Sequence, residues 1–341
     1  MKQVIRKLVA GEDLSREEAT RAMDLVLDNG ATLPQISAFL TLLRSKGETV
    51  DEIVGCAAML KRKACHIHPK ANDYVDLVGT GGDGANTFNI STTSAFVVAG
   101  AGVPVAKHGN RAISSRSGSV DVLEELGINV MITPEQVTEC VNDIGIGFMS
   151  ARTFHQSMKN VSIVRGDLGI RTIFNILGPI SNPSDAKCQV IGVFSESLVH
   201  PLAESIMQMG VERGVVMCSE GIDEFTTLSD TTMSMIRKGE VMDSVFHPQD
   251  FGFTLAKPEA IVGGTAAENA VITKQILNGE KGARRDIVLL NAGMTMYVQG
   301  SAQTVEEGIE KAAQAIDTGA AMEKLNRLVQ VTNHMNMEKA Q

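Results

Sequence analysis

The sequence predicts an α/β protein in two parts: a small all-helical N-terminal domain, and a larger α/β domain whose central, largely parallel sheet is surrounded by helices. Residues 1–70 show only helical periodicity, whereas from about residue 73 short apolar strand segments alternate with amphipathic helical segments. A length of 341 residues suits two domains, or one large α/β unit with an appendage. We therefore expect a helical domain at 1–70 and an α/β domain at 71–341.

Capping boxes mark the helix starts of the first part, since each pairs a Ser or Thr with a Glu or Gln three residues later. They are Ser15 with Glu18, Thr32 with Gln35, and Thr49 with Glu52. Apolar residues follow each box at helical spacing, which predicts consecutive helices.

The second part is predicted to alternate between strands and helices. Strands are expected at 74–78, 103–106, 128–131, 146–149, 188–194 and 213–218, and a hairpin at 233–236 and 241–245 with a four-residue loop. Helices are expected at 91–101, 118–126, 134–143, 197–209, 266–278, 283–297, 304–317 and 319–331. The stretch 151–187 has helical spacing broken by two Gly-Pro or Asn-Pro pairs, and fits neither pattern.

Charge and cysteine usage exclude several classes of protein. The 31 Lys and Arg against 40 Asp and Glu give a net charge of −9, which disfavours nucleic-acid and anionic-membrane partners. No apolar run approaches the ~20 residues of a membrane helix. The five cysteines are widely spread and never form a CxxC pair, so the expected compartment is the reducing cytoplasm.

A glycine-rich loop follows the first predicted strand, with the sequence Gly-Thr-Gly-Gly-Asp-Gly at 79–84. Glycines let backbone N–H groups turn toward a ligand, and the polar run 86–93 then precedes an apolar helix whose start offers further N–H groups. The loop is neither a Walker A loop nor a GxGxxG fingerprint. It predicts phosphate binding of a general kind.

Two more polar loops lie at comparable positions. Lys107-His108-Gly109-Asn110-Arg111 follows the strand 103–106, and a serine-rich run at 114–119 precedes the next helix. Loops that follow parallel strands meet at one edge of a sheet, and Lys and Arg neutralise phosphate. Three such loops within 41 residues indicate one polyanionic small molecule.

The adjacent carboxylates Asp223 and Glu224 suit Mg²⁺, which is usually held by one or two carboxylates together with substrate phosphates. The run Cys65-His66-Ile67-His68 has no fourth ligand nearby, and we interpret it as an interdomain loop.

Taken together, these motifs resemble the anthranilate phosphoribosyltransferase family. The match continues through residues 164–165, 168–172, 174–175, 177–179, 223–224, 263–264, 268–270, 286 and 289–292, and covers nearly the whole chain in order. The resemblance implies a homodimer formed through the helical part, helices from about 165–185 joined to the N-terminal domain, and a substrate site in the cleft between the domains.

The reaction implied is transfer of the phosphoribosyl group of 5-phosphoribosyl 1-diphosphate to the amine of anthranilate, with Mg²⁺ as cofactor. This is the second step of tryptophan biosynthesis from chorismate. Catalysis would come from positioning and electrostatics, without a catalytic nucleophile.

The resemblance also implies the site residues. Phosphoribosyl diphosphate would be bound by Gly79, Gly82, Asp83, Thr87, Asn89, Ile90, Ser91, Thr92, Lys107, His108, Gly109, Asn110, Arg111, Ala112, Ile113, Ser114, Ser115 and Ser119. Anthranilate would be bound by Gly79, Asn110 and Arg165, and Mg²⁺ by Ser91, Asp223 and Glu224.

The chain departs from the family pattern at Ser150, Arg152, Gln156 and Ile163, beside the implied anthranilate entrance. Two alternative functions are considered for this fold. One is a pyrimidine-nucleoside-phosphorylase-like enzyme, which would lack His108-Gly109-Asn110 and the acidic pair. The other is a non-catalytic nucleic-acid-binding relative of the same fold, which the net charge of −9 opposes.

Overall fold

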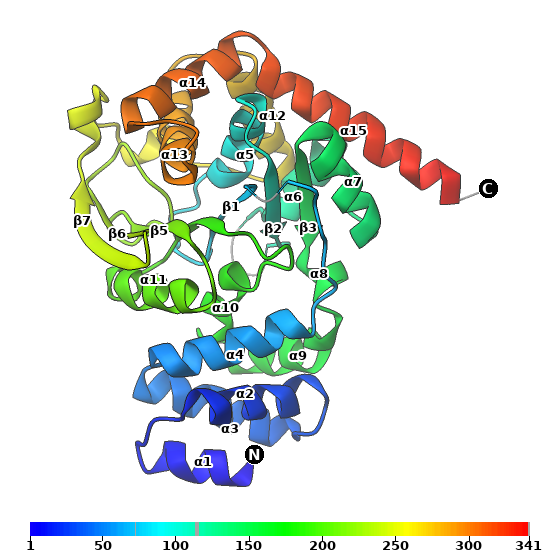
Figure 1. The fold of residues 1–341 in the computed structure, drawn as a ribbon, viewed down its shortest axis with the longest axis vertical. Helices are drawn as coiled ribbons and strands as arrows, with labels where there is room; N and C mark the ends of the chain where they lie inside the picture. The colour runs from blue at the N-terminus through cyan, green and yellow to red at the C-terminus, as the bar shows by residue number, and fades with distance from the viewer. Residues whose placement is uncertain (72, 113–115, 340–341) are drawn as a thin grey trace.

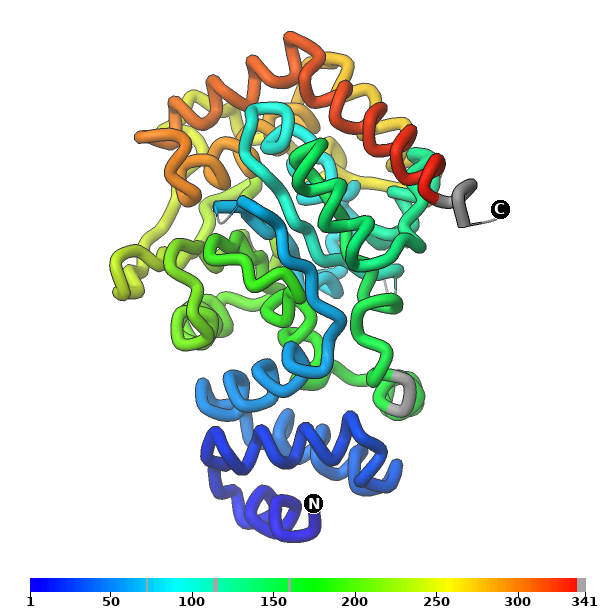
Figure 2. The backbone as a smooth tube through the Cα atoms, turned by 45° about the vertical axis from the view of Figure 1, so that its right-hand side comes forward, coloured from blue at the N-terminus to red at the C-terminus, as the bar shows by residue number. Residues whose placement is uncertain are grey.

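The computed structural model describes residues 1–71, 73–112 and 116–339. A helical lobe forms one end of the molecule and a helix-covered sheet forms the rest (Figure 1). Figure 2 shows that the lobe, with the N-terminus at its far end, projects from the larger body. Within the described ranges, no helix is long and apolar enough to cross a membrane.

The lobe is built from four N-terminal helices and one helix from the middle of the chain. The first four are α1 (Lys2–Val9), α2 (Arg16–Leu27), α3 (Leu33–Lys46) and α4 (Val50–Arg62). The fifth, α9 (Lys159–Leu168), packs against α2 and α3. The stretch that had no assignment from sequence thus supplies a helix to the lobe, and α10 (Phe174–Ile180) and α11 (Val199–Gln208) pack against α4.

Seven strands form one sheet in the order β3-β2-β1-β4-β5-β6-β7. Their bounds are β1 (Val75–Gly79), β2 (Val105–Gly109), β3 (Ile146–Ser150), β4 (Cys188–Gly192), β5 (Arg213–Cys218), β6 (Thr231–Arg237) and β7 (Glu240–Phe246). The first five are parallel, and β6 and β7 are antiparallel. From β1 the sheet extends through β2 and β3 on one side and then through β4 and β5 on the other. The strand order therefore reverses between β1 and β4. Ligands bind at such a reversal in open α/β sheets.

The other elements surround the sheet or connect its strands. The α-helices are α5 (Ile90–Gly100), α6 (Ser119–Glu125), α7 (Pro134–Ile144), α8 (Ala151–Phe154), α12 (Ala266–Leu277), α13 (Ala283–Gln299), α14 (Val305–Asp317) and α15 (Ala320–Lys339). Short 3₁₀ turns lie at Gln156–Met158, Glu196–Leu198, Pro248–Phe251 and Pro258–Ile261.

Two apolar clusters cover the two faces of the sheet. Successive strand residues point to opposite faces, so Val190 of β4 joins the cluster under α5 and α13, and its neighbour Ile191 joins the cluster shared with α11 and the helical lobe. The lobe therefore lies on the α11 side of the sheet, where α4 packs on α10 and α11 (Figure 1).

Two sequence expectations were wrong. Residues 128–131 form no strand, because the buried Ile128 and Val130 pack their side chains from a connecting segment and Asn129 bonds to Thr332 of α15 (N to Oγ1, 3.2 Å). The hairpin loop has two residues, not four, since the strands continue to Arg237 and Glu240. Its Lys238 and Gly239 have φ of 56° and 78°, as a type I′ turn requires.

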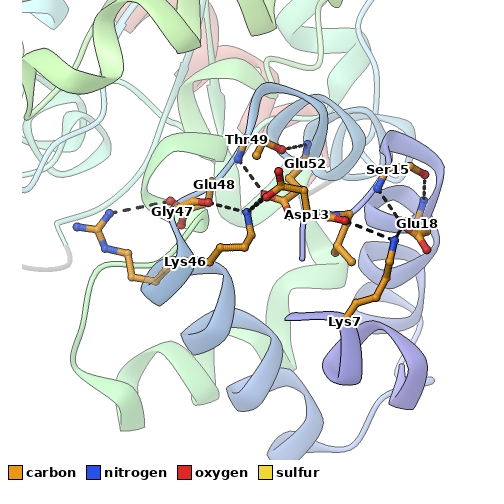
Figure 3. A network of polar contacts seen from close by, with 11 residues as sticks. Lys7, Asp13, Ser15, Glu18, Lys46, Gly47, Glu48, Thr49 and Glu52 are labelled. Carbon is orange, nitrogen blue, oxygen red and sulfur yellow. Dashed lines mark hydrogen bonds and ion pairs between the residues drawn. The ribbon is translucent and has the colours of Figure 1, made fainter. Parts of the chain in front are cut away.

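A buried carboxylate organises the polar contacts of the helical lobe. Glu52 has no exposed surface, and its Oε1 accepts the Leu14 N–H at 3.0 Å. Its Oε2 accepts the Thr49 N–H at 2.8 Å and the Lys46 ammonium at 3.0 Å (Figure 3). The capping box predicted for Thr49 and Glu52 is therefore confirmed, and the same side chain ties α4 to the α1–α2 connection and to the end of α3.

Glu52→Ala should lower the free energy of unfolding by about 3 kcal/mol, because it leaves the Leu14 N–H and the Lys46 ammonium without their partner inside the lobe. Urea or thermal unfolding of the variant measures the loss. Asp51→Ala is the matched control, since Asp51 is exposed and pairs with Arg16 at the surface, a contact worth about 0–1 kcal/mol. Equal midpoints for the two variants would contradict this role for Glu52.

Candidate active site

The glycine-rich loop leaves β1 at the reversal of strand order and is fastened to the neighbouring strand ends. The Thr80 N–H donates to the Gly192 carbonyl at the end of β4 (3.0 Å), and the Gly81 N–H donates to Oδ2 of Asp223 (2.6 Å). Gly81, Gly82 and Gly84 have φ of 67°, 71° and 78°. Three left-handed residues within four positions form the kind of concave backbone that binds anions.

Gly79 lies against the Asp223 carboxylate. A Cβ built on Gly79 would overlap the Asp223 carboxylate oxygen, and one built on Gly192 would overlap the Asp223 backbone carbonyl. The two glycines end β1 and β4 side by side, in register. The absence of a side chain at both positions is what admits Asp223 to the reversal point.

Three carboxylates share this point. Asp223 and Glu224 are 7 % exposed, and the Asp83 carboxylate lies beside Asp223. Burial and the neighbouring Asp83 charge raise the pKa of Asp223 to about 7, and burial with the Asp223 charge raises the pKa of Glu224 to about 8. The site therefore holds more negative charge than its surroundings solvate, which favours a bound cation.

Lys107 supplies one compensating charge. Its side chain is 1 % exposed, and its ammonium donates to the Leu77 carbonyl and to Oγ of Ser91 (3.2 Å). Desolvation lowers the pKa of Lys107, while the charges of Asp76 and Glu224 oppose that shift. The lysine lies beneath the site and links β2 to the start of α5.

Asn89 connects the glycine-rich segment to α12 and to the loop before α6. It precedes α5, and its Oδ1 accepts Nδ2 of Asn269 from α12 (2.9 Å) and the Ser117 hydroxyl (3.2 Å). The next residues begin α5, whose Ser91 N–H donates to Oε1 of Glu224 (3.0 Å). Asn269 lies in the matching stretch 268–270 but is not among the implied site residues. Its hydrogen bond to Asn89 joins positions 180 residues apart, which no short motif predicts.

The loop after β2 is closed by side chains of α6. Ser119 Oγ accepts the Asn110 N–H (3.1 Å), and the Asp121 carboxylate accepts the Ala112 and Gly118 N–H groups at 2.8 and 2.9 Å. Gly109 lies so close that a Cβ there would overlap Ser119 Oγ. The described residues on either side of 113–115 are thus held together at the carboxyl end of β2.

Arg111 is not a free cation. Its guanidinium pairs with Asp121 (2.9 Å) and with Glu124 on α6. Its charge is therefore already compensated at the surface. The expected residues Ile113, Ser114 and Ser115 lie outside the described residues.

Several expected residues have side chains that are buried or bonded to neighbouring elements. Ile90 and Thr92 are 1 % exposed on α5. His108 points to α10, where its Nδ1 donates to the Gly178 carbonyl (3.2 Å), and burial lowers its pKa to about 3, so the ring is neutral at pH 7. Thr87 joins Val262 through an isolated β-bridge, which anchors the glycine-rich segment.

Arg165 lies on α9, apart from the sheet. Its guanidinium is 5.8 Å from the Phe174 ring centroid, and it forms no ion pair in the described part of the chain. Partial burial lowers its pKa from the ordinary arginine value. A half-buried arginine without a carboxylate partner is suited to an anionic ligand.

The residues present fit Mg²⁺. The donors are hard carboxylate oxygens, and burial together with a neighbouring carboxylate raises the pKa values of Asp223 and Glu224. Among the residues that the structure describes, no group of three His, Cys, Asp or Glu side chains could hold a metal by itself. Mg²⁺ is usually held by one or two carboxylates together with water and substrate phosphates.

Comparison with known proteins identifies the class. Residues 71–322 match the model of the glycosyl transferase family α/β domain, and residues 2–64 match that of the helical bundle domain of the same family. The chain belongs to this glycosyltransferase family.

Within it, the chain belongs to the anthranilate phosphoribosyltransferases. It is 50% identical over 334 residues to the anthranilate phosphoribosyltransferase of Acetivibrio thermocellus, covering 98% of this chain and 97% of the relative, and 48% identical to that of Pelotomaculum thermopropionicum, covering 100% and 99%. These relatives do not favour the two other functions weighed from the sequence.

Solved structures agree in fold. The anthranilate phosphoribosyltransferase of Thermus thermophilus superposes with a TM-score of 0.92 at 38% identity, covering 97% of this chain and 99% of that one. The Saccharomyces cerevisiae enzyme in complex with phosphoribosyl diphosphate and Mg superposes with a TM-score of 0.89 at 27% identity, covering 97% of each chain. The predicted fold class is confirmed.

Gly79→Ala should displace the Asp223 carboxylate and lower activity by about 100-fold or more, because the new Cβ occupies the space of that oxygen. A steady-state assay with thermal unfolding separates activity from stability. Gly166→Ala is the control, since a Cβ there meets no atom within 4 Å and Ala favours the helix. Full activity of Gly79→Ala would contradict the close packing described here.

Proposed function

We propose that this chain transfers the phosphoribosyl group of 5-phosphoribosyl 1-diphosphate to the amine of anthranilate, giving N-(5-phosphoribosyl)anthranilate and pyrophosphate. The observation that carries the proposal is the meeting of a concave glycine loop with two buried, incompletely neutralised carboxylates at the strand-order reversal. Such a place can hold a diphosphate together with a divalent cation. Membership of the anthranilate phosphoribosyltransferases supports the same reaction.

Phosphoribosyl diphosphate would lie over the carboxyl ends of β1 and β2. The backbone N–H groups of the loop 79–84 and of the start of α5 would bind its phosphate oxygens, and Lys107 would add a fixed positive charge. Asn110 and Ser119 would contact its other side. Arg111 would contribute through its backbone, since its side chain is paired with Asp121 and Glu124.

Mg²⁺ would be held by Asp223, Glu224 and Ser91 together with oxygens of the diphosphate. When bound, it would neutralise the negative charge that develops on the departing pyrophosphate. The Ser91 hydroxyl already lies 3.2 Å from the Lys107 ammonium, beside Glu224, so these groups are close enough to act on one ligand.

Anthranilate would be bound by Arg165, Asn110 and the backbone at Gly79. A bidentate contact between the Arg165 guanidinium and the carboxylate would aim the amine at C1 of the ribose. The amine attacks C1 as the bond to pyrophosphate breaks, and the nitrogen then loses a proton. The protein forms no covalent bond, so rate enhancement would come from orientation and charge stabilisation.

The test is an assay of the purified chain with Mg²⁺ and phosphoribosyl diphosphate. Pyrophosphate release is expected when anthranilate is added and not before. Absence of product at saturating substrate would refute the function.

Arg165→Ala should raise the KM for anthranilate by about 10- to 100-fold, since it removes a charge-assisted bidentate contact. The KM for phosphoribosyl diphosphate should change by less than about two-fold. Steady-state kinetics with each substrate varied in turn distinguishes the two constants. Equal effects on both would rule out a selective anthranilate role.

We also propose a homodimer formed through the helical lobe. Val9 and Leu33 expose 69% and 42% of their surface on α1 and α3, where a second lobe could cover them. A mass by light scattering equal to one chain would refute the dimer.

A further inference from the structure

Arg171 lies between α9 and α10, and its side chain reaches the glycine-rich loop. Its Nη2 donates to the Gly82 carbonyl oxygen. Its guanidinium also lies over the Phe194 ring, 4.2 Å from the ring centroid. Stacking on an aromatic face orients the plane of the guanidinium, and the fork of donors then has a defined direction.

The bond to the Gly82 carbonyl fixes the direction of one amide group. In a trans peptide the carbonyl of one residue and the N–H of the next point in opposite directions. With the Gly82 carbonyl held by Arg171, the Asp83 N–H points away from Arg171. Within the described ranges, no hydrogen bond uses the N–H groups of Gly82, Asp83 or Gly84, so they are free to bind a ligand.

The loop is also held at both ends, at its start by the strand ends and after residue 84 by the bridge between Thr87 and Val262. The Thr80 N–H is held by Gly192 and the Gly81 N–H by Asp223, both before the turn. Gly81, Gly82 and Gly84 have few steric limits on φ and lose much conformational freedom on ordering. The contact of Arg171 with the Gly82 carbonyl therefore holds the middle of the loop, between its two attached ends.

Arg171 belongs to the segment that carries Arg165. The two residues are six positions apart, with Gly169 in a left-handed conformation between them at the end of α9 (φ 60°). The segment packs on the helical lobe through α9, and its Arg171 contacts the loop 79–84. Neither composition nor the family motifs assigned Arg171 a role.

We propose that Arg171 is a positioning residue that holds the Gly82 peptide so that the loop 79–84 presents its free N–H groups to the diphosphate of phosphoribosyl diphosphate. The proposal rests on the function proposed above. Arg171 itself does not contact the reacting atoms. It acts through the backbone of the loop, and stacking on Phe194 fixes the orientation of its guanidinium.

Arg171→Ala should raise the KM for phosphoribosyl diphosphate by about ten-fold, which corresponds to about 1.4 kcal/mol. The KM for anthranilate should change by less than about two-fold. Arg171→Lys keeps the charge but loses the planar fork, so it should recover only part of the loss. Phe194→Leu should show a smaller change in the same direction.

Chemical rescue separates positioning from a general loss of structure. Added guanidinium ion, at concentrations that leave the wild-type rate unchanged, should lower the raised KM of Arg171→Ala. Arg237→Ala, on the exposed end of β6, is the matched control and should show neither the defect nor the rescue. An unchanged KM for phosphoribosyl diphosphate, an equal rise in both KM values, or an absence of rescue would overturn the proposal.

A binding measurement distinguishes failure of this proposal from failure of the function. Calorimetric titration of wild type and Arg171→Ala with pyrophosphate and Mg²⁺ requires no turnover. A wild type that binds pyrophosphate but forms no product would refute the reaction alone. Equal pyrophosphate affinity in wild type and variant would refute the role of Arg171, even in an active enzyme.

Discussion

The site depends on the burial of two adjacent carboxylates, Asp223 and Glu224, at the point where the strand order reverses. Each is 7 % exposed, and Asp83 adds a third carboxylate beside them. Lys107 opposes only part of this charge from below. Such an arrangement is unfavourable without a cation or a proton, because burial penalises each charge and the charges repel each other. The fold tolerates it because Gly79 and Gly192 leave space for Asp223 and because backbone N–H groups bond to both side chains.

This arrangement explains how an acidic chain can bind a polyanion. The net charge of −9 disfavours a long polyanion such as nucleic acid, which needs an extended positive surface. A single diphosphate needs only local donors, and in the proposed function those are the turned backbone at 79–84, the start of α5 and Lys107. Positive surface charge contributes little, since Arg111 is already paired with two carboxylates of α6.

Much of the architecture could be predicted from sequence, because it rests on local signals. Capping boxes and periodic apolar residues predicted α2, α3 and α4, but not α9. The glycines at 79–84 predict a phosphate-binding loop, and the structure shows three of them in left-handed conformations. The strand predicted at 128–131 is wrong because alternating apolar residues indicate burial and not strand pairing. Ile128 and Val130 are buried here without pairing to a strand.

Contacts distant in sequence could not be predicted from local patterns. Asn269 meets Asn89 across 180 positions, and Arg171 meets Gly82 across 89. Their hydrogen bonds depend on how α12 and the segment after α9 pack, which no short motif encodes. The pairing of Arg111 likewise follows from the position of α6. The residue types predicted that these side chains could bind an anion or form hydrogen bonds. The packing of the helices determines which of them already have a partner within the protein.

The most direct measurement of the central claim is the pH dependence of Mg²⁺-assisted binding of phosphoribosyl diphosphate, followed by calorimetry. The pKa values of Asp223 and Glu224 are raised to about 7 and 8, so protons compete with Mg²⁺ at lower pH. The apparent Mg²⁺ affinity should rise from pH 6 to about pH 8 with proton release on binding, and then level off. An affinity that is independent of pH over this range, without proton release, would contradict the role assigned to the buried carboxylates.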